Sequence, residues 1–125
     1  MTPEQVQALT NDKIRVSVAE AVGWTGIHEE DRSGFGGYRG YRVTIPGYCY
    51  VDFVPNYPAD LNACAEAERM IVTKLQEVAY IEHLTAILNR DNDGTFRKLG
   101  AGPIDYARAS ARQRCEAFIL TMTTP

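Results

Sequence analysis

Three arginines near the end of the 125-residue chain have the type and spacing that bind phosphate. Arg108 and Arg112 are four residues apart, so on a helix they lie one turn apart and point the same way. A guanidinium group can bind phosphate through two hydrogen bonds at once, and backbone amides at a helix start also favour an anion. The pair therefore predicts a site for a phosphorylated small molecule, with Arg114 as a second candidate.

The same arginines also fit a solvated helix face. Glu116 follows Arg112 by four residues and can pair with it on a helix. Exposed pairs of this kind contribute little to stability, and charged runs on helices are usually solvated. The residues alone leave both interpretations open.

An aromatic ring beside positive charge would complete a nucleotide site. Phe96 directly precedes Arg97 and Lys98, and stacking of a base on an aromatic ring contributes on the order of 1–3 kcal/mol. We therefore expect Phe96 to be the stacking residue. Other aromatic residues, such as Trp24 after an apolar helix, are more typical of core packing.

The sequence favours binding over catalysis. Carboxylates are common, but Glu66 and Glu68 are two positions apart on a predicted helix, so they do not face each other and make a poor catalytic pair. The cysteines are widely separated and have no histidine at metal-ligand spacing: Cys49, Cys64 and Cys115. We expect buried, reduced thiols, no catalytic residue, no metal site and no cofactor.

The bulk composition predicts one domain, covering residues 1–125. Hydrophobic residues make up 45% of the chain, which is enough for a core, and charged residues make up 23%. A formal net charge of −3 argues against long nucleic acid or an anionic membrane as the main partner. Because the start of the chain has no basic lead and no apolar run approaches the length of a membrane span, we expect a cytoplasmic protein.

Helical periodicity predicts one helix near each end of the chain. The first is expected at residues 11–24, with Asn11 as its N-cap and Gly23 at its end. The last is expected at residues 106–124, where it carries the arginines on an alanine-rich segment. This helix also has an apolar stripe, typical of a buried face.

Two more helical segments are expected in the middle of the chain. Asp60 is a suitable N-cap for a helix at residues 61–70, and a second helical run covers residues 72–88. The β-branched segment at residues 71–73 is the expected interruption between them.

Residues 41–54 have the β-branched and aromatic composition of strands. Two strands are expected, at residues 42–45 and 47–54, joined by a tight turn at Pro46 and Gly47. A flexible loop is expected at residues 25–40, with a short strand around Arg39 and with the glycine-rich part at residues 33–40 as a surface hairpin or lid. Another short strand is expected at residues 95–99. Together the elements predict an α+β fold with an antiparallel sheet flanked by helices.

The tyrosines of this part of the chain, Tyr38, Tyr41, Tyr48 and Tyr50, offer a different kind of function, as an interaction surface. Alternate strand positions share a face, so Tyr48 and Tyr50 point the same way. Aromatic residues are enriched in protein interfaces. The strands therefore also fit a protein–protein interaction domain without a small-molecule ligand, or a contact between copies in a homo-oligomer.

Three segments of the chain resemble the phage ABA-sandwich domain family. They lie at residues 11–24, 54–68 and 109–118, so the resemblance spans most of the chain. It implies a small α+β domain, encoded by a phage or prophage, with helices on both sides of an antiparallel sheet.

Some of these phage domains are similar to anti-defence sponges, which block the bacterial Thoeris system. Such proteins sequester cyclic ADP-ribose-type signals, and some also capture cyclic oligonucleotides, without cleaving them. In that group a pair of helical arginines near the C-terminus holds the ligand phosphates, which implies this role for Arg108 and Arg112. The resemblance also implies a homo-oligomer that is not an enzyme.

Overall fold

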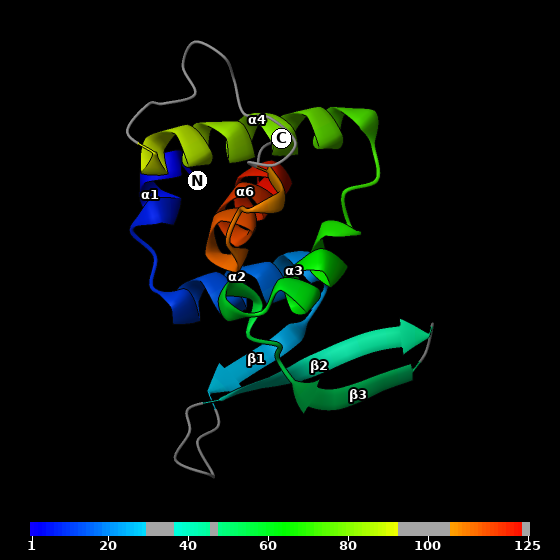
Figure 1. Ribbon diagram of the computed structural model, residues 1–125. Coiled ribbons are helices and arrows are strands. Elements are labelled where there is room, and N and C mark those ends of the chain that lie inside the picture. The colour runs from blue at the N-terminus through cyan, green and yellow to red at the C-terminus, as the bar shows by residue number, and fades with distance from the viewer. Residues whose placement is uncertain (30–36, 46–47, 93–105, 124–125) are drawn as a thin grey trace.

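The computed structural model describes residues 1–29, 37–45, 48–92 and 106–123. Across these residues the chain forms a single compact α+β domain, as the sequence predicted (Figure 1). The helices are α1 (Pro3–Gln7), α2 (Asn11–Val22), α3 (Leu61–Glu68), α4 (Lys74–Asp91) and α6 (Ala111–Thr123). The strands are β1 (Thr25–Glu29), β2 (Tyr38–Ile45) and β3 (Tyr48–Phe53).

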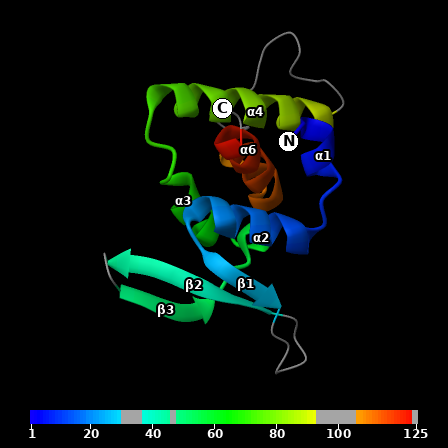
Figure 2. The same cartoon turned by 180° about the vertical axis from the view of Figure 1, so that it is seen from behind.

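Helix α6 lies at the centre of a helical body. Figures 1 and 2 show it between α4 on one side and α2 and α3 on the other, with the sheet beyond α2 and α3. All residues of α6 from Cys115 to Thr121 are buried, and they meet buried side chains of the surrounding helices, among them Val6, Ile14, Val18, Cys64 and Leu84. The main core is therefore helical.

The described helices all lie on one side of the sheet in both views. The arrangement with helices on both sides, which the resemblance implies, is therefore wrong for the described residues. Trp24 joins the two parts, since its side chain is buried and Gly40 of β2 lies close against its ring. A Cβ at Gly40 would come within 3.3 Å of that ring.

Local capping explains where α2 begins and ends. Gly23 has a φ of 115° and ends the helix, as predicted. The N-cap is Thr10 and not Asn11: Thr10 has an extended backbone, and its hydroxyl accepts from the Lys13 amide at 3.2 Å. Helix α1 was not predicted, and its start is fixed by Thr2, which forms a capping box with Gln5.

The two middle helices are separated as the sequence predicted. Asp60 caps α3 through the amides of Asn62 and Ala63, and the helix ends at Glu68, two residues before the predicted end. Residues 71–73 are not helical. Thr73 then forms a capping box with Gln76, which fixes the start of α4 at Lys74. Helix α4 continues to Asp91, beyond the predicted end at residue 88.

The expected helix at residues 106–124 is interrupted. Residues 106 and 107 are helical, but the chain then leaves the helix, and α6 begins only at Ala111. Ser110 causes the new start, because its hydroxyl accepts from the Gln113 amide at 3.1 Å and the Gln113 side chain accepts from the Ser110 amide at 2.9 Å. Arg108 and Arg112 therefore do not lie on one continuous helix.

The sheet is antiparallel, in the order β1-β2-β3. The predicted pairing of the two strands around residues 42–54 is confirmed, with Tyr41 opposite Val51 and Arg39 opposite Phe53. Strand β1 falls in the segment expected to be a loop, so that expectation is wrong for residues 25–29, whereas the short strand expected around Arg39 is confirmed as part of β2. The glycine-rich part up to residue 36, the turn at residues 46–47 and the expected strand at residues 95–99 lie outside the described residues.

Candidate functional site

Arg112 binds the connection between α1 and α2. Its guanidinium donates to the backbone carbonyls of Leu9 at 2.8 Å and Gln7 at 3.2 Å, and to the side chain of Asn11 at 3.0 Å. Its Nε lies 3.5 Å from the carboxylate of Glu116. The planar fork of donors suits carbonyls that have no partner at the end of a helix. Arg112 thus joins α6 to the N-terminal segment of the chain.

Glu116 provides the negative charge for this part of the core. The residue is 3% exposed, and its carboxylate lies 3.6 Å from Arg90 of α4 and 3.5 Å from Arg112. A buried carboxylate needs such partners, because removing a charge from water is costly. The predicted pairing of Arg112 with Glu116 is confirmed, but it is a buried pair and not a solvated one.

Arg114 closes the connection that precedes α6. Its guanidinium donates to the carbonyls of Tyr106 and Ala109, both at 3.3 Å, and lies 3.5 Å from the carboxylate of Glu68. Glu68 also accepts a hydrogen bond of 2.8 Å from the Tyr80 hydroxyl. Burial raises the pKa of Tyr80, and the nearby Glu68 carboxylate raises it further.

Arg15 is a third arginine that links two segments by donating to backbone carbonyls, and it was not among the predicted residues. Its Nε donates to the carbonyls of Val54 and Pro55, both at 3.1 Å. Its guanidinium also lies over the ring of Tyr38, 5.5 Å from the ring centre. Arg15 therefore connects α2 to the end of β3.

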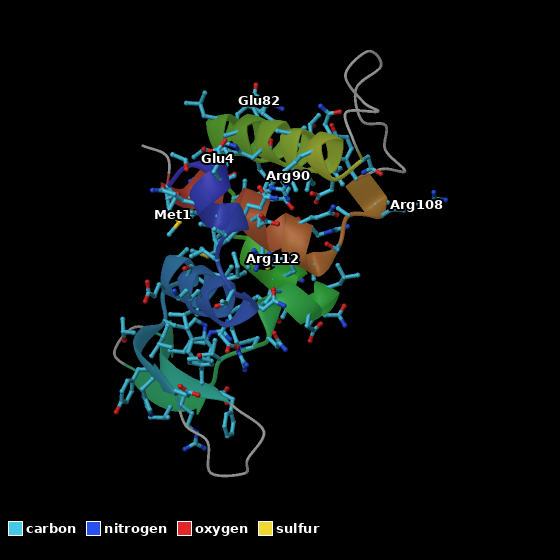
Figure 3. All side chains as sticks on the ribbon, turned by 90° about the vertical axis from the view of Figure 1, so that its left-hand side faces the viewer. Met1, Glu4, Glu82, Arg90, Arg108 and Arg112 are labelled. Atoms are coloured by element: carbon cyan, nitrogen blue, oxygen red, sulfur yellow. The ribbon has the colours of Figure 1, made fainter. Side chains whose placement is uncertain are left out.

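The structure does not bring the predicted ligand residues together. Arg108 is exposed in the turn before α6 and projects away from the body, whereas Arg112 lies against it (Figure 3). Arg114 donates to backbone carbonyls of the segment that precedes its own helix. Phe96 lies outside the described residues. The phosphate site at these residues remains a prediction.

Two buried thiols lie side by side in the helical core. The sulfur atoms of Cys64 and Cys115 are 3.8 Å apart, and both residues are free cysteines, as the sequence predicted. The hydrogen bond with Cys64 and burial both raise the pKa of Cys115. A thiol that keeps its proton is a poor nucleophile, so this pair fits a structural role.

Helix α4 borders a surface hollow of about 500 Å³. Its apolar lining comes from Ile71, Val78 and Ile81, and its carboxylates come from Glu68, Glu77 and Glu82. Lys74 is the cation among the lining residues. Because the carboxylates outnumber this cation, the hollow disfavours a phosphorylated ligand.

The two faces of the sheet have different surroundings. On the inner face, Arg42 lies over the ring of Trp24, 5.5 Å from its centre. On the outer face, Tyr41 is 45% exposed, Val51 47% and Phe53 56%. The Arg39 guanidinium stacks on the Phe53 ring, 4.4 Å from its centre.

Gly26 of β1 makes room for the outer face. Its φ is 59°, and a Cβ there would lie 2.8 Å from the ring of Tyr41. The tyrosine ring can therefore pack close against the backbone of β1. Of the four tyrosines predicted for an interaction surface, Tyr41 lies on this outer face and Tyr38 lies against Arg15. The side chains of Tyr48 and Tyr50 are not among the described ones.

Two further features are absent from the described residues. No cluster of three or more metal-ligating side chains occurs there. No helix in the same part of the chain combines the length and apolar character needed to cross a membrane.

Comparisons with known proteins give no relative. The chain matches no family model, no curated protein and no solved structure at a significant level. The resemblance to the phage ABA-sandwich family therefore stays a prediction, and function has to be argued from this structure.

Proposed function

We propose that this protein is a protein-binding domain whose sheet binds an extended, apolar segment of a partner protein. The observation that carries the proposal is the outer face of the sheet, defined here by Arg39, Tyr41, Val51 and Phe53. Three of these residues are large and apolar, and about half of each is exposed. Large apolar side chains gathered on one face mark interaction sites more often than scattered ones do.

The free edge of β3 favours an extended partner. The Val54 amide donates to the Tyr38 carbonyl at 2.8 Å, so the preceding amide, that of Phe53, points away from β2. The Asp52 side chain accepts from this amide at 2.8 Å. Edge strands are commonly protected by charged side chains or proline, and in β3 Asp52 is the charged residue. An incoming strand would replace the Asp52 carboxylate as the acceptor.

The side chains of the outer face set the chemistry of the partner. A strand beside β3 would place every second side chain next to Val51 and Phe53. Apolar or aromatic residues at those alternate positions would cover the exposed surface, while main-chain hydrogen bonds would hold the segment in register. The stacked pair of Arg39 and Phe53 offers a flat platform for such a ring.

The experiment is selection from a display library of short random peptides by the full-length protein. We expect enriched peptides to carry apolar residues at alternate positions. Phe53→Glu should bind them more than about tenfold less tightly, because it places a charge at the centre of the interface. The fold should persist, since Phe53 is 56% exposed.

The matched control is Leu61→Glu. Leu61 is also apolar and 52% exposed, but it lies in the first turn of α3, where an acid is favourable. We expect this variant to bind the selected peptides as the original protein does. Failure to enrich any peptide, or equal affinity of Phe53→Glu for the enriched ones, would refute the proposal.

The predicted cyclic nucleotide ligand calls for a separate measurement. Arg108 is the informative residue, because Arg112 is already bound within the protein. The protein would be titrated with cyclic ADP-ribose isomers and cyclic oligonucleotides, and the ligand recovered after heating. Under this prediction a ligand binds, Arg108→Ala weakens the binding, and the ligand is recovered intact. Absence of binding to every member of the panel would contradict it.

A further inference from the structure

Helix α4 has more apolar surface than the fold covers. Its buried residues are Tyr80, Leu84, Ile87 and Leu88. The first turns of the helix, before Tyr80, contribute no buried residue. Leu75 is 84% exposed, Val78 46% and Ile81 45%. The apolar arc of α4 thus continues past the buried side to the surface.

These exposed residues form one stripe. On a helix, Leu75, Val78 and Ile81 follow each other at intervals of three residues and lie within one face. Ile71 lies beside the stripe in the hollow at its N-terminal end. Thr85 bounds the stripe at the other end, where its hydroxyl lies 2.6 Å from the hydroxyl of Tyr106. An apolar stripe flanked by charged residues is the usual form of a helix–helix interface.

We propose that α4 forms a two-fold interface with a second copy of this chain, in which the two α4 helices pack antiparallel with Val78 at the centre. This proposal concerns a different surface from the sheet and does not depend on the proposed partner. A two-fold interface needs a surface that is complementary to itself, and α4 has that property.

The self-complementarity follows from the residue numbers. When two antiparallel helices cross at Val78, position 75 of one copy lies at the level of position 81 of the other, and position 74 at the level of position 82. Leu75 therefore meets the level of Ile81, and Lys74 meets the level of Glu82. The apolar residues come together at the centre, and opposite charges come together at both ends.

Lys74 is free to pair with Glu82 of the second copy, because its contact within its own chain is weak. Its amino group lies 3.7 Å from Glu77, but the two side chains are 87% and 58% exposed, so the pair is weak. In the dimer the same amino group can reach Glu82 of the second copy. The charge pattern would also oppose a parallel arrangement, which places like residues of the two copies at the same level.

The experiment is sedimentation equilibrium of the full-length protein over a series of concentrations. We expect the mass to rise from 13.9 kDa toward twice that value. Val78→Glu should remain monomeric over the same series, because it places two carboxylates opposite each other at the two-fold axis. Circular dichroism would show that the variant is folded, as expected for a residue that is 46% exposed.

A charge exchange tests the antiparallel arrangement. Lys74→Glu and Glu82→Lys should each weaken the dimer, and the double variant should restore it. Phe53→Glu on the sheet is the control and should form the dimer normally. The proposal is overturned if the original protein stays monomeric, if Val78→Glu dimerises as well as the original protein, or if the double variant is weaker than both single variants.

Discussion

The helical body and the sheet differ in how they use the side chains that could bind a partner. In the helical body, polar groups that could hold a ligand are bound within the protein, as Arg112 and Glu116 are. In the sheet, apolar groups that could fill a core remain on the surface, as Tyr41 and Phe53 do. The comparison shows that a dense cluster of charge in the sequence does not identify the side chains that are free to bind a partner. Those side chains are the ones that the fold leaves exposed.

Two phenylalanines give the largest expected contrast between these regions. Phe118 of α6 is 1% exposed, whereas Phe53 of β3 is 56% exposed. We expect Phe118→Ala to lower the free energy of unfolding by about 3–5 kcal/mol, because it leaves a cavity in the core. Phe53→Ala should lower it by less than about 1 kcal/mol. Urea titration of both variants measures the difference, and similar losses would show that the sheet is as important to stability as the helical core.

Two arginines give the next contrast. Arg112 loses its bonds to the carbonyls of Leu9 and Gln7 when it is replaced by alanine. We expect Arg112→Ala to destabilise the protein by roughly 1.5–3 kcal/mol, since hydrogen bonds to a charged group are lost and Glu116 loses one of the two arginines that pair with it among the described residues.

Arg108→Ala is the matched variant, because it removes an arginine from the exposed turn before α6. Its effect on the free energy of unfolding should stay within about 0.5 kcal/mol. Thermal and urea unfolding of both variants provide the measurement. Equal stability of the two would mean that the contacts of Arg112 with the N-terminal segment do not hold the fold together.

The parts of the fold that were predicted correctly depend on neighbouring residues. Asp60 and Gly23 act within their own helix ends, so their types were sufficient to place the start of α3 and the end of α2. The capping box of Ser110 and Gln113 also has a local sequence pattern, Ser-x-x-Gln. The prediction of a continuous helix did not take this pattern into account. That error put Arg108 and Arg112 on one helix.

The remaining features depend on residues that are distant in sequence. The partners of Arg112 in the N-terminal segment lie more than a hundred positions away, so no local pattern could show that its donors are occupied. Strand β1 contains a glycine with a positive φ and pairs with an irregular register, which hid it from a pattern based on alternation. The exposure of Leu75 and Phe53 could not be predicted either, because it depends on which faces the other elements cover.

The smallest expected change in stability at neutral pH concerns Tyr80, and its pH dependence tests the polar contacts of the helical body. Burial and Glu68 raise the pKa of Tyr80 above that of a free tyrosine, about 10. Because the folded-state pKa is the higher one, the folded protein keeps the proton. This contribution to stability is therefore complete below about pH 10 and is lost as the pH rises from there toward the folded-state pKa.

Tyr80→Phe separates this effect from general alkaline unfolding. The variant lacks the hydrogen bond to Glu68 and should be about 1 kcal/mol less stable near pH 7. Between about pH 9 and pH 11, however, its free energy of unfolding should fall less than that of the original protein. Tyr57, whose pKa burial also raises, is present in both proteins, so the difference isolates Tyr80. Parallel curves from urea titrations across this range would show that the Tyr80 hydroxyl titrates as freely in the folded protein as in the unfolded chain.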